Sequence, residues 1–290
     1  MRLRLACLCL LPLFAGPAAA QLKLQWHFKP GEQFVLERVY RQKQDIEVKD
    51  RSLKHETTNR WTLRLTVKEK HLTHWDIRAT FEEVVCKDGG AIPPAAFDEK
   101  LAARLKGLSL VLHVNGQGEV KKIVGYDNFL TKLSEGKRDA EKVVHALFSE
   151  EGLHAIFEEV FAFLPPKTAK RGESWKRETV DPVPPFGSFK TQLRYSYEGE
   201  RDGLHAIDFT TRTVLQKSSE KSDLFRVLKT ALTGEEGRGT YLFDPIAGRL
   251  VRGERAMTLR GELTVEAAGV TTTMRFVSQN ELKLSLRPVK

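Results

Sequence analysis

The segment Phe163-Leu-Pro-Pro-Lys-Thr-Ala-Lys-Arg-Gly-Glu-Ser-Trp175 stands near the middle of the 290-residue chain and separates two sequence patterns. Pro165 and Pro166 have no backbone N–H and disfavour helical geometry in the residues before them, so a helix is predicted to end at Leu164. A polar link follows, and Gly172-Glu-Ser-Trp175 then opens a second series of strands. We therefore expect helix just before this joint and β-structure on both sides of it.

Working outward toward the N-terminus, residues 34–82 show the strongest strand pattern. Apolar side chains occupy alternate positions, and polar ones lie between them. Successive side chains of a strand face opposite sides, so one face would cover a core and the other would meet water. The expected inward residues are Phe34, Leu36, Tyr40, Ile46, Val48, Trp61, Leu63, Leu65, Val67, Trp75, Ile77, Ala79 and Phe81. We expect an interruption at Asp88-Gly-Gly90, a short helix from Phe97 to Leu105, and a hairpin over residues 108–124.

The period changes between Asp127 and Leu164, where apolar residues recur at four-residue spacing. This predicts two or three helices whose apolar stripe covers the sheet, with Ser149 capping one of them. Strand alternation returns after the joint, over residues 189–197, 207–209, 241–250, 257–265 and 274–286. Residues 224–232 fit a short helix or an irregular strand equally well.

These patterns predict an α+β, β-dominated fold. The sheet would be antiparallel and strongly curved, an open half-barrel with helices packed on its concave face, because long half-apolar strands need a cover. Residues 21–290 would form a single β-rich domain. Two similar halves, 21–164 and 172–290 joined at 165–171, are an alternative, since both contain a strand, a glycine-containing turn and a second strand.

Residues 1–20 have the three parts of a secretory signal peptide. Arg2 and Arg4 precede an apolar run from Leu5 to Phe14, and Ala18-Ala-Ala20 supplies a cleavage site. Ten apolar residues are too few to span a bilayer, which takes about 20. We therefore expect secretion across the inner membrane to the periplasm or the exterior, and a mature chain that starts at Gln21 and has no transmembrane segment.

Charge and cysteine content narrow the classes of protein further. Loss of the two signal arginines lowers the formal net charge from +9 to +7, and the basic residues are dispersed among acidic ones, which is not the pattern of a nucleic-acid-binding surface. Only Cys86 remains after cleavage, so no intramolecular disulfide can form. We expect Cys86 to be a small buried side chain, with a reactive thiol or a disulfide-linked dimer as the alternative.

No catalytic or metal-binding motif stands out. His71 and His74 are three residues apart, a spacing that brings ligands together on a helix but is not expected to do so on a strand or turn. Gly116-Gln-Gly118 precedes a strand, whereas a phosphate-binding loop precedes a helix. We therefore expect no enzyme activity, no cofactor and no metal. An enzyme would need a cleft that gathers His71, His74 or His205 with Asp or Glu.

Several turn and core motifs carry a family resemblance: Leu164-Pro-Pro166 with Gly172-Glu-Ser-Trp175, Phe243-Asp-Pro-Ile-Ala-Gly-Arg-Leu250, and the strand pair that starts at Gly253. With these motifs the mature chain resembles an uncharacterised secreted bacterial family of unknown function. More loosely, its fold is similar to the half-barrels of periplasmic lipoprotein carriers and related lipid-binding proteins, a likeness that implies an apolar ligand by analogy only.

Two functions stay open. In the first, the chain is a non-enzymatic cell-envelope protein that binds an apolar or lipid-like ligand between sheet and helices. In the second, it is a structural or interaction module of the envelope that binds a partner protein and no small molecule. The first predicts a cavity, and ligand pockets are typically about 300–1,000 Å³. Its lining is expected to comprise Trp61, Leu63, Trp75, Ile77, Phe157, Phe161, Leu193 and Tyr195.

Overall fold

The computed structural model describes residues 23–49, 51–90, 99–183, 186–217, 226–267 and 269–289. The predicted signal peptide lies outside the described residues. Most of the described residues lie in strands and far fewer in helices, and the 13 described strands all belong to one antiparallel sheet. The prediction of a β-dominated, curved antiparallel sheet is therefore confirmed.

The elements follow the predicted order. The first half contains β1 (Gln33–Val48), β2 (Arg51–Lys70), β3 (Trp75–Gly90), α1 (Glu99–Leu105), β4 (Ser109–Val114), β5 (Val120–Val124), α2 (Tyr126–Ser134), α3 (Arg138–Leu147) and α4 (Glu150–Phe161). The second half contains β6 (Ser174–Val183), β7 (Gly187–Arg201), β8 (Leu204–Lys217), β9 (Arg226–Thr230), β10 (Thr233–Gly234), β11 (Gly237–Asp244), β12 (Arg249–Ala267) and β13 (Val270–Pro288).

The first and last strands join the two halves of the chain into one sheet. The main path of neighbouring strands is β5-β4-β3-β2-β1-β13-β12-β10-β8-β7-β6, with β11 between β12 and β8 and β9 beside β12. β1 pairs with β13 over its full length, from Phe34 opposite Pro288 to Val48 opposite Met274. Two strands that are far apart in the sequence therefore pair at the middle of the sheet, and this pairing joins the two halves of the chain.

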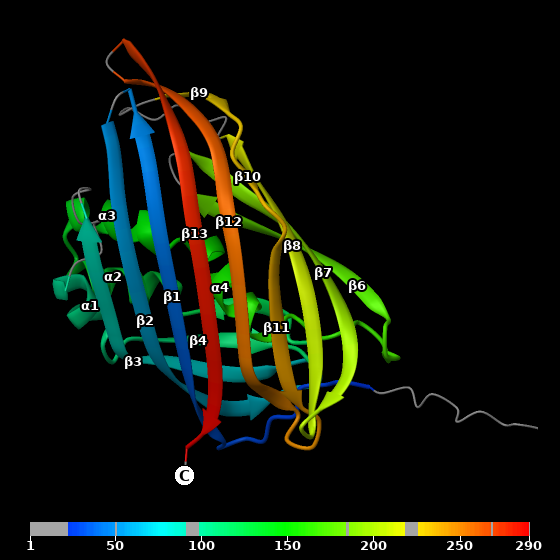
Figure 1. Ribbon diagram of the computed structural model, residues 1–290. Helices are drawn as coiled ribbons and strands as arrows, with labels where there is room; N and C mark the ends of the chain where they lie inside the picture. The colour runs from blue at the N-terminus through cyan, green and yellow to red at the C-terminus, as the bar shows by residue number, and fades with distance from the viewer. Residues whose placement is uncertain are drawn as a thin grey trace, which may run out of the picture.

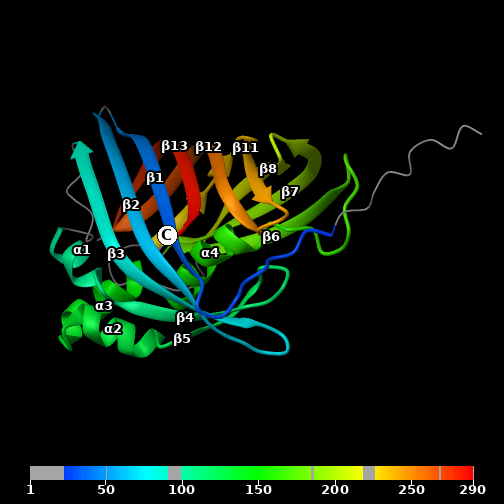
Figure 2. The ribbon, with the colours of Figure 1, turned by 90° about the horizontal axis from the view of Figure 1, so that it is seen from below.

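The sheet curls into a trough, and the helices lie on its concave side (Figures 1 and 2). Viewed from below, in Figure 2, the strands curve around α4. This helix packs against both β5 and β6, the two ends of the strand path. Ser149 caps it as predicted, because its Oγ accepts a hydrogen bond from the backbone N–H of Gly152 at 3.0 Å.

The helices cover only part of the trough. In Figure 1 the upper ends of β1, β2, β12 and β13 extend beyond them. The covered part contains one large cluster of buried side chains contributed by both halves of the sheet, by the helices and by the N-terminal segment. We refer to this cluster as the main core, and Trp26, Phe34, Phe81, Phe157 and Phe243 are among its largest members.

Four local features complete the comparison with the predicted elements. β3 continues through the predicted interruption to Gly90, since its backbone still pairs with β2 there. Residues 23–29 alternate like a strand but form none, and their apolar side chains anchor an irregular segment through contacts such as Trp26 Nε1–H donating to the carbonyl oxygen of Phe161 at 2.8 Å. The undecided stretch is strand β9, while α1 begins at Glu99 and Phe97 lies outside the described residues.

Candidate functional site

The eight side chains predicted to line a cavity lie together in the main core. Seven are buried, with exposed fractions of 8% or less, and Trp75 is partly buried against the same cluster. Other side chains contact them closely: the ring of Trp61 lies 5.7 Å from that of Phe81, and Phe161 lies 5.2 Å from Trp26. These residues therefore belong to one cluster, while a cavity among them stays a prediction.

Beyond the main core, the inward positions of the strands become polar. We call this band the polar belt; it crosses the concave face and comprises Arg38, Tyr40, Gln42, His55, Thr57, Asn59, Thr191, Thr211, Thr213, Arg255, Ser278 and Asn280. Register places its members side by side, since Gln42 lies opposite both Thr57 and Asn280. Hydrogen bonds link several of them, including Tyr40 OH to Asn280 Oδ1 at 2.6 Å and the hydroxyls of Thr191 and Thr213 at 2.9 Å.

A buried carboxylate on α4 holds two arginines of the belt. Glu159 Oε2 lies 3.2 Å from Arg38 Nη2, and its Oε1 lies 2.6 Å from Arg255 Nη1. The backbone carbonyl of Glu159 also accepts a hydrogen bond from Tyr241 OH at 3.0 Å. Because Arg38 belongs to β1 and Arg255 to β12, this carboxylate fixes the helix to two strands of the sheet.

Burial shifts the titration of several groups around this carboxylate. Desolvation and the charge of Glu159 together raise the pKa of Asp181 to about 6, against the opposing effect of Arg255 and Arg38. Desolvation also raises the pKa values of Tyr40, Tyr195 and Tyr241, so their hydroxyls stay protonated at neutral pH. Near the carboxylate, the concave face is therefore a poorly solvated site that holds mostly neutral hydrogen-bonding groups and one charge-balanced network.

A second apolar cluster lies on the other side of the belt, at the end of the trough that extends beyond the helices. We call it the distal cluster. Three of its side chains are buried, and the other seven are only partly buried. Its members are Leu215, Leu232, Leu263, Val183, Phe186, Phe189, Val227, Val265, Met274 and Phe276. The concave face therefore has three bands along its strands: main core, polar belt and distal cluster.

Four side-chain polar atoms at and beside the belt are buried and have no hydrogen-bond partner among the described residues: Arg38 Nε, Asn59 Oδ1, Trp61 Nε1 and Thr211 Oγ1. Buried polar atoms without a partner are uncommon in folded proteins, and each costs about 1–3 kcal/mol. Arg38, Asn59 and Trp61 lie on the neighbouring strands β1 and β2, so their two N–H donors and one acceptor could together bind a ligand group of mixed polarity, whereas the Thr211 hydroxyl lies on β8.

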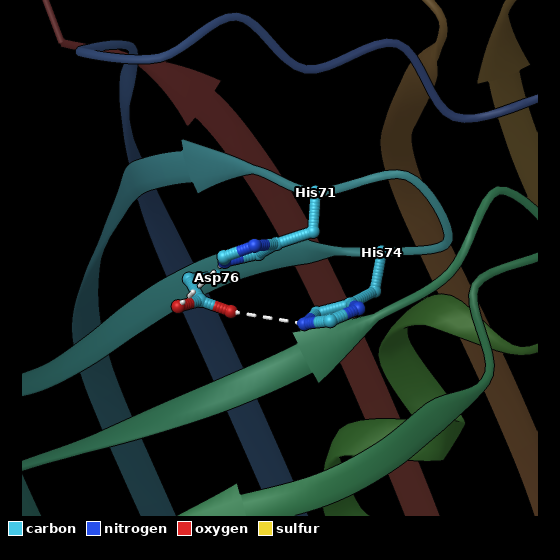
Figure 3. Close-up of side chains that lie close together, drawn as sticks. All are labelled: His71, His74 and Asp76. Atoms are coloured by element: carbon cyan, nitrogen blue, oxygen red, sulfur yellow. Dashed lines mark ion pairs between the residues drawn. The ribbon is translucent and has the colours of Figure 1, made fainter.

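A separate group of histidines lies on the outer face, at the turn between β2 and β3. The Nε2 atoms of three histidines approach the carboxylate of Asp76: His71 at 3.2 Å, His74 at 3.3 Å and His113 at 3.4 Å. Figure 3 shows His71 and His74 converging on Asp76. Burial lowers the pKa of His113, and the charge of Asp76 partly offsets this.

The spacing argument against a site at His71 and His74 is therefore wrong. The backbone N–H of His71 donates to the carbonyl of His74 at 2.8 Å, and this tight turn stacks the two rings 4.5 Å apart. The third histidine of the sequence hypothesis, His205, does not belong to this group; its Nδ1 hydrogen-bonds to Tyr197 OH. Cys86, predicted to be buried, is partly buried.

The sequence itself contains a signal for some of the residues in the polar belt. Along β1 the inward positions pass from Phe34 and Leu36 through Arg38 and Gln42 to Ile46, so the three bands are visible in one strand. His113 and Asp76 are different, because their proximity depends on the register between β3 and β4, which places them directly opposite each other. Nothing local in the sequence gives that register.

The helices of the structure and two comparisons with known proteins give the following findings. Within the residues that the structure describes, no helix has the length and apolar character needed to cross a membrane. No curated protein matches the sequence. A solved structure described as "lipid-protein interactions in lipovitellin" is similar to 90% of this chain, with 12% sequence identity and a TM-score of 0.48, and the chain spans only 25% of that protein.

The sequence also matches a family of proteins. Residues 82–245, more than half of the chain, match the family described as "Family of unknown function (DUF6263)". The match confirms the predicted resemblance to an uncharacterised family, and it includes the joint at residues 165–171 and Phe243 in β11. The chain therefore belongs to the family DUF6263.

Proposed function

We propose that this protein is a secreted, non-enzymatic binder of a single-chain, lipid-like amphiphile on the concave face of its sheet. The apolar tail would lie against the distal cluster, and the polar end would reach the polar belt. Secretion is supported by the signal-peptide pattern of residues 1–20.

One observation carries the proposal: a partly exposed apolar cluster lies inside the trough, next to a belt that contains buried polar atoms without partners. Exposed apolar side chains that gather in one place commonly mark a binding site. Phe189, Met274 and Phe276 would gain apolar contacts from a hydrocarbon chain, and this face lies beyond the helices that cover the main core (Figure 1). Ligand sites combine such apolar walls with a few polar groups that fix orientation.

Hydrogen bonding, rather than net charge, would hold the polar end of the ligand. Arg38 and Arg255 already pair with Glu159, so neither arginine offers a full unpaired charge. The donors Arg38 Nε and Trp61 Nε1, with the hydroxyl of Thr211, remain available. A hydroxyl, ester or amide head group would satisfy donors and acceptors of this kind.

Native mass spectrometry of residues 21–290, purified from the envelope fraction without detergent, tests whether a ligand is present. The expected result is a reproducible additional mass that disappears on denaturation and is identified as a single-chain lipid. A bare monomer mass in repeated preparations, together with no binding of an added fluorescent single-chain lipid, would contradict the proposal.

A pair of neighbouring substitutions on β13 tests where the ligand binds. Phe276 faces the distal cluster, while Val277 points to the outer face, where it borders a polar groove. Burying a Phe side chain contributes about 1.5–3 kcal/mol. Phe276→Asn should therefore weaken binding of a fluorescent single-chain lipid about tenfold or more, and Val277→Asn should change it less than about twofold. Equal effects of the two substitutions would place the ligand elsewhere.

An envelope interaction module without a small ligand is the second candidate. It is favoured by a groove of about 1030 Å³ on the outer face of β7, β8, β11, β12 and β13, lined by charges of both signs that include Arg194, Arg238, Asp208, Glu254 and Lys283. Bare protein in the native mass measurement, with a partner captured by wild type and lost on charge reversal of Arg238 and Lys283, would favour this function.

A further inference from the structure

We propose that His71, His74, Asp76 and His113 form a binding site for a divalent transition-metal ion, with zinc as the expected metal. The site lies on the outer face of the sheet, at the β2–β3 turn, so it is separate from the concave face discussed above. His71 and His74 come from the turn, Asp76 from the start of β3 and His113 from β4.

The four side chains are held together by backbone structure rather than by chance surface contact. Asp76 and His113 are direct cross-strand partners. The turn closed by His71 and His74 places their rings in a stack, and the ring of His113 stacks on the other side of His74, with centroids 4.5 Å apart in both pairs. Possible ligand atoms of His71, His74 and Asp76 all lie within 4.8 Å of one another.

The distances suit a tetrahedral ion. Zinc bonds to imidazole nitrogen and carboxylate oxygen are about 2.0–2.2 Å, so two ligand atoms of a tetrahedral zinc ion lie about 3.3–3.5 Å apart. Nε2 of His74 and Nε2 of His113 lie 3.3 and 3.4 Å from Asp76 Oδ1, and Nε2 of His71 lies 3.2 Å from Asp76 Oδ2.

Two further contacts favour metal binding. Asp76 Oδ1 is buried, and among the described residues it has no hydrogen-bond partner, so it faces only the imidazoles. Thr73 Oγ1 lies 3.2 Å from His74 Nδ1. A ligating histidine commonly donates its second ring N–H to such a neighbour, which leaves the lone pair of Nε2 directed at the ion. Three imidazoles and one carboxylate are a ligand set that zinc accepts.

Zinc titration of the untagged mature chain, residues 21–290, after treatment with EDTA and dialysis, tests the site by isothermal calorimetry. We expect one zinc ion per chain. His74→Gln and His113→Gln should each weaken binding at least tenfold, and the double variant should abolish it. His145→Gln is the matched control, because His145 is an exposed histidine on α3 outside the cluster, and it should leave binding unchanged.

Cobalt substitution gives a second readout that does not depend on stability. Co²⁺ in the wild-type chain should show the intense visible absorption of a tetrahedral site, and the double variant should not. Circular dichroism would establish that the variants are folded. The proposal is overturned if wild type binds no zinc, or if the folded double variant binds it as tightly as wild type; in either case the histidines only form ion pairs with Asp76.

Discussion

Replacing Glu159 by Gln tests the ion-pair network that fixes α4 to the sheet. The substitution keeps the side-chain shape but removes the charge between Arg38 and Arg255, whose guanidinium nitrogens lie 3.2 and 2.6 Å from the carboxylate. The three side chains are between 12% and 18% exposed. Breaking a buried ion pair costs about 3–5 kcal/mol, and we expect the lower end, about 3 kcal/mol, because some solvent still reaches these groups.

Urea unfolding followed by circular dichroism measures this loss on residues 21–290. A loss of about 3 kcal/mol corresponds to a fall in Tm of roughly 5 °C for a domain of this size. Glu158→Gln is the control: its side chain is 26% exposed and only reaches His154 at 3.8 Å, so it should cost less than about 1 kcal/mol. If the two variants lose the same stability, the network does not fix the helix as we infer.

A double-mutant cycle separates the ion pair from packing. Arg255→Met and Glu159→Leu should each destabilise the protein, because the first removes one of the two partners of Glu159 and the second leaves both arginines without their carboxylate. The double variant should lose less than the sum of the two, with a coupling free energy above about 1 kcal/mol. Additive losses would show that the 2.6 Å contact contributes little.

Three further predictions concern pH, packing and capping. The folded-state pKa of Asp181, about 6, lies above its usual value of 3.8, so ionisation of this carboxyl lowers stability as pH rises from about 4 to 6. Asp181→Asn should therefore raise the free energy of unfolding at pH 7 by at most about 3 kcal/mol, and it should have no such effect at pH 3. Urea unfolding measures both values, and a gain of the same size at both pH values would contradict the prediction. A Cβ on Gly253 would lie 2.6 Å from the ring of Tyr241, so Gly253→Ala should cost about 1–3 kcal/mol, whereas Gly116→Ala, with open space around it, should cost far less. Ser149→Ala removes the cap of α4 and should cost about 1 kcal/mol in the same assay, and an unchanged midpoint would show that the cap is dispensable.

The strands were predictable because their signal is local. Alternation at Trp61, Leu63, Leu65 and Val67 is a property of consecutive residues, and all four side chains are buried as expected. The helices between 126 and 161 were predictable for the same reason, since their apolar side chains recur every third or fourth residue. Residues 23–29 show the limit of this reasoning, because alternation also arises where an irregular segment buries every second side chain.

The candidate sites depended on contacts between distant residues. The polar belt forms only because β1 pairs with both β2 and β13, which brings Gln42 beside Thr57 and Asn280. The histidine cluster depends on the turn at residues 71–74 and on the register of β4 against β3. A shift of one residue in that register would turn His113 to the opposite face and remove it from the cluster.

By itself, the sequence determined most of the long strands and the helical region, which strand faces are apolar, and that the joint at residues 165–171 lies between two β-rich parts of the chain. These features follow from backbone geometry and from side-chain periodicity within short segments. Only the tertiary structure decided that β1 and β13 unite the parts, that α4 is fixed by Glu159 between two arginines, and that a partly exposed apolar cluster remains beyond the polar belt. Those features depend on the register between strands and on the curvature of the whole sheet, which no short segment of the sequence specifies.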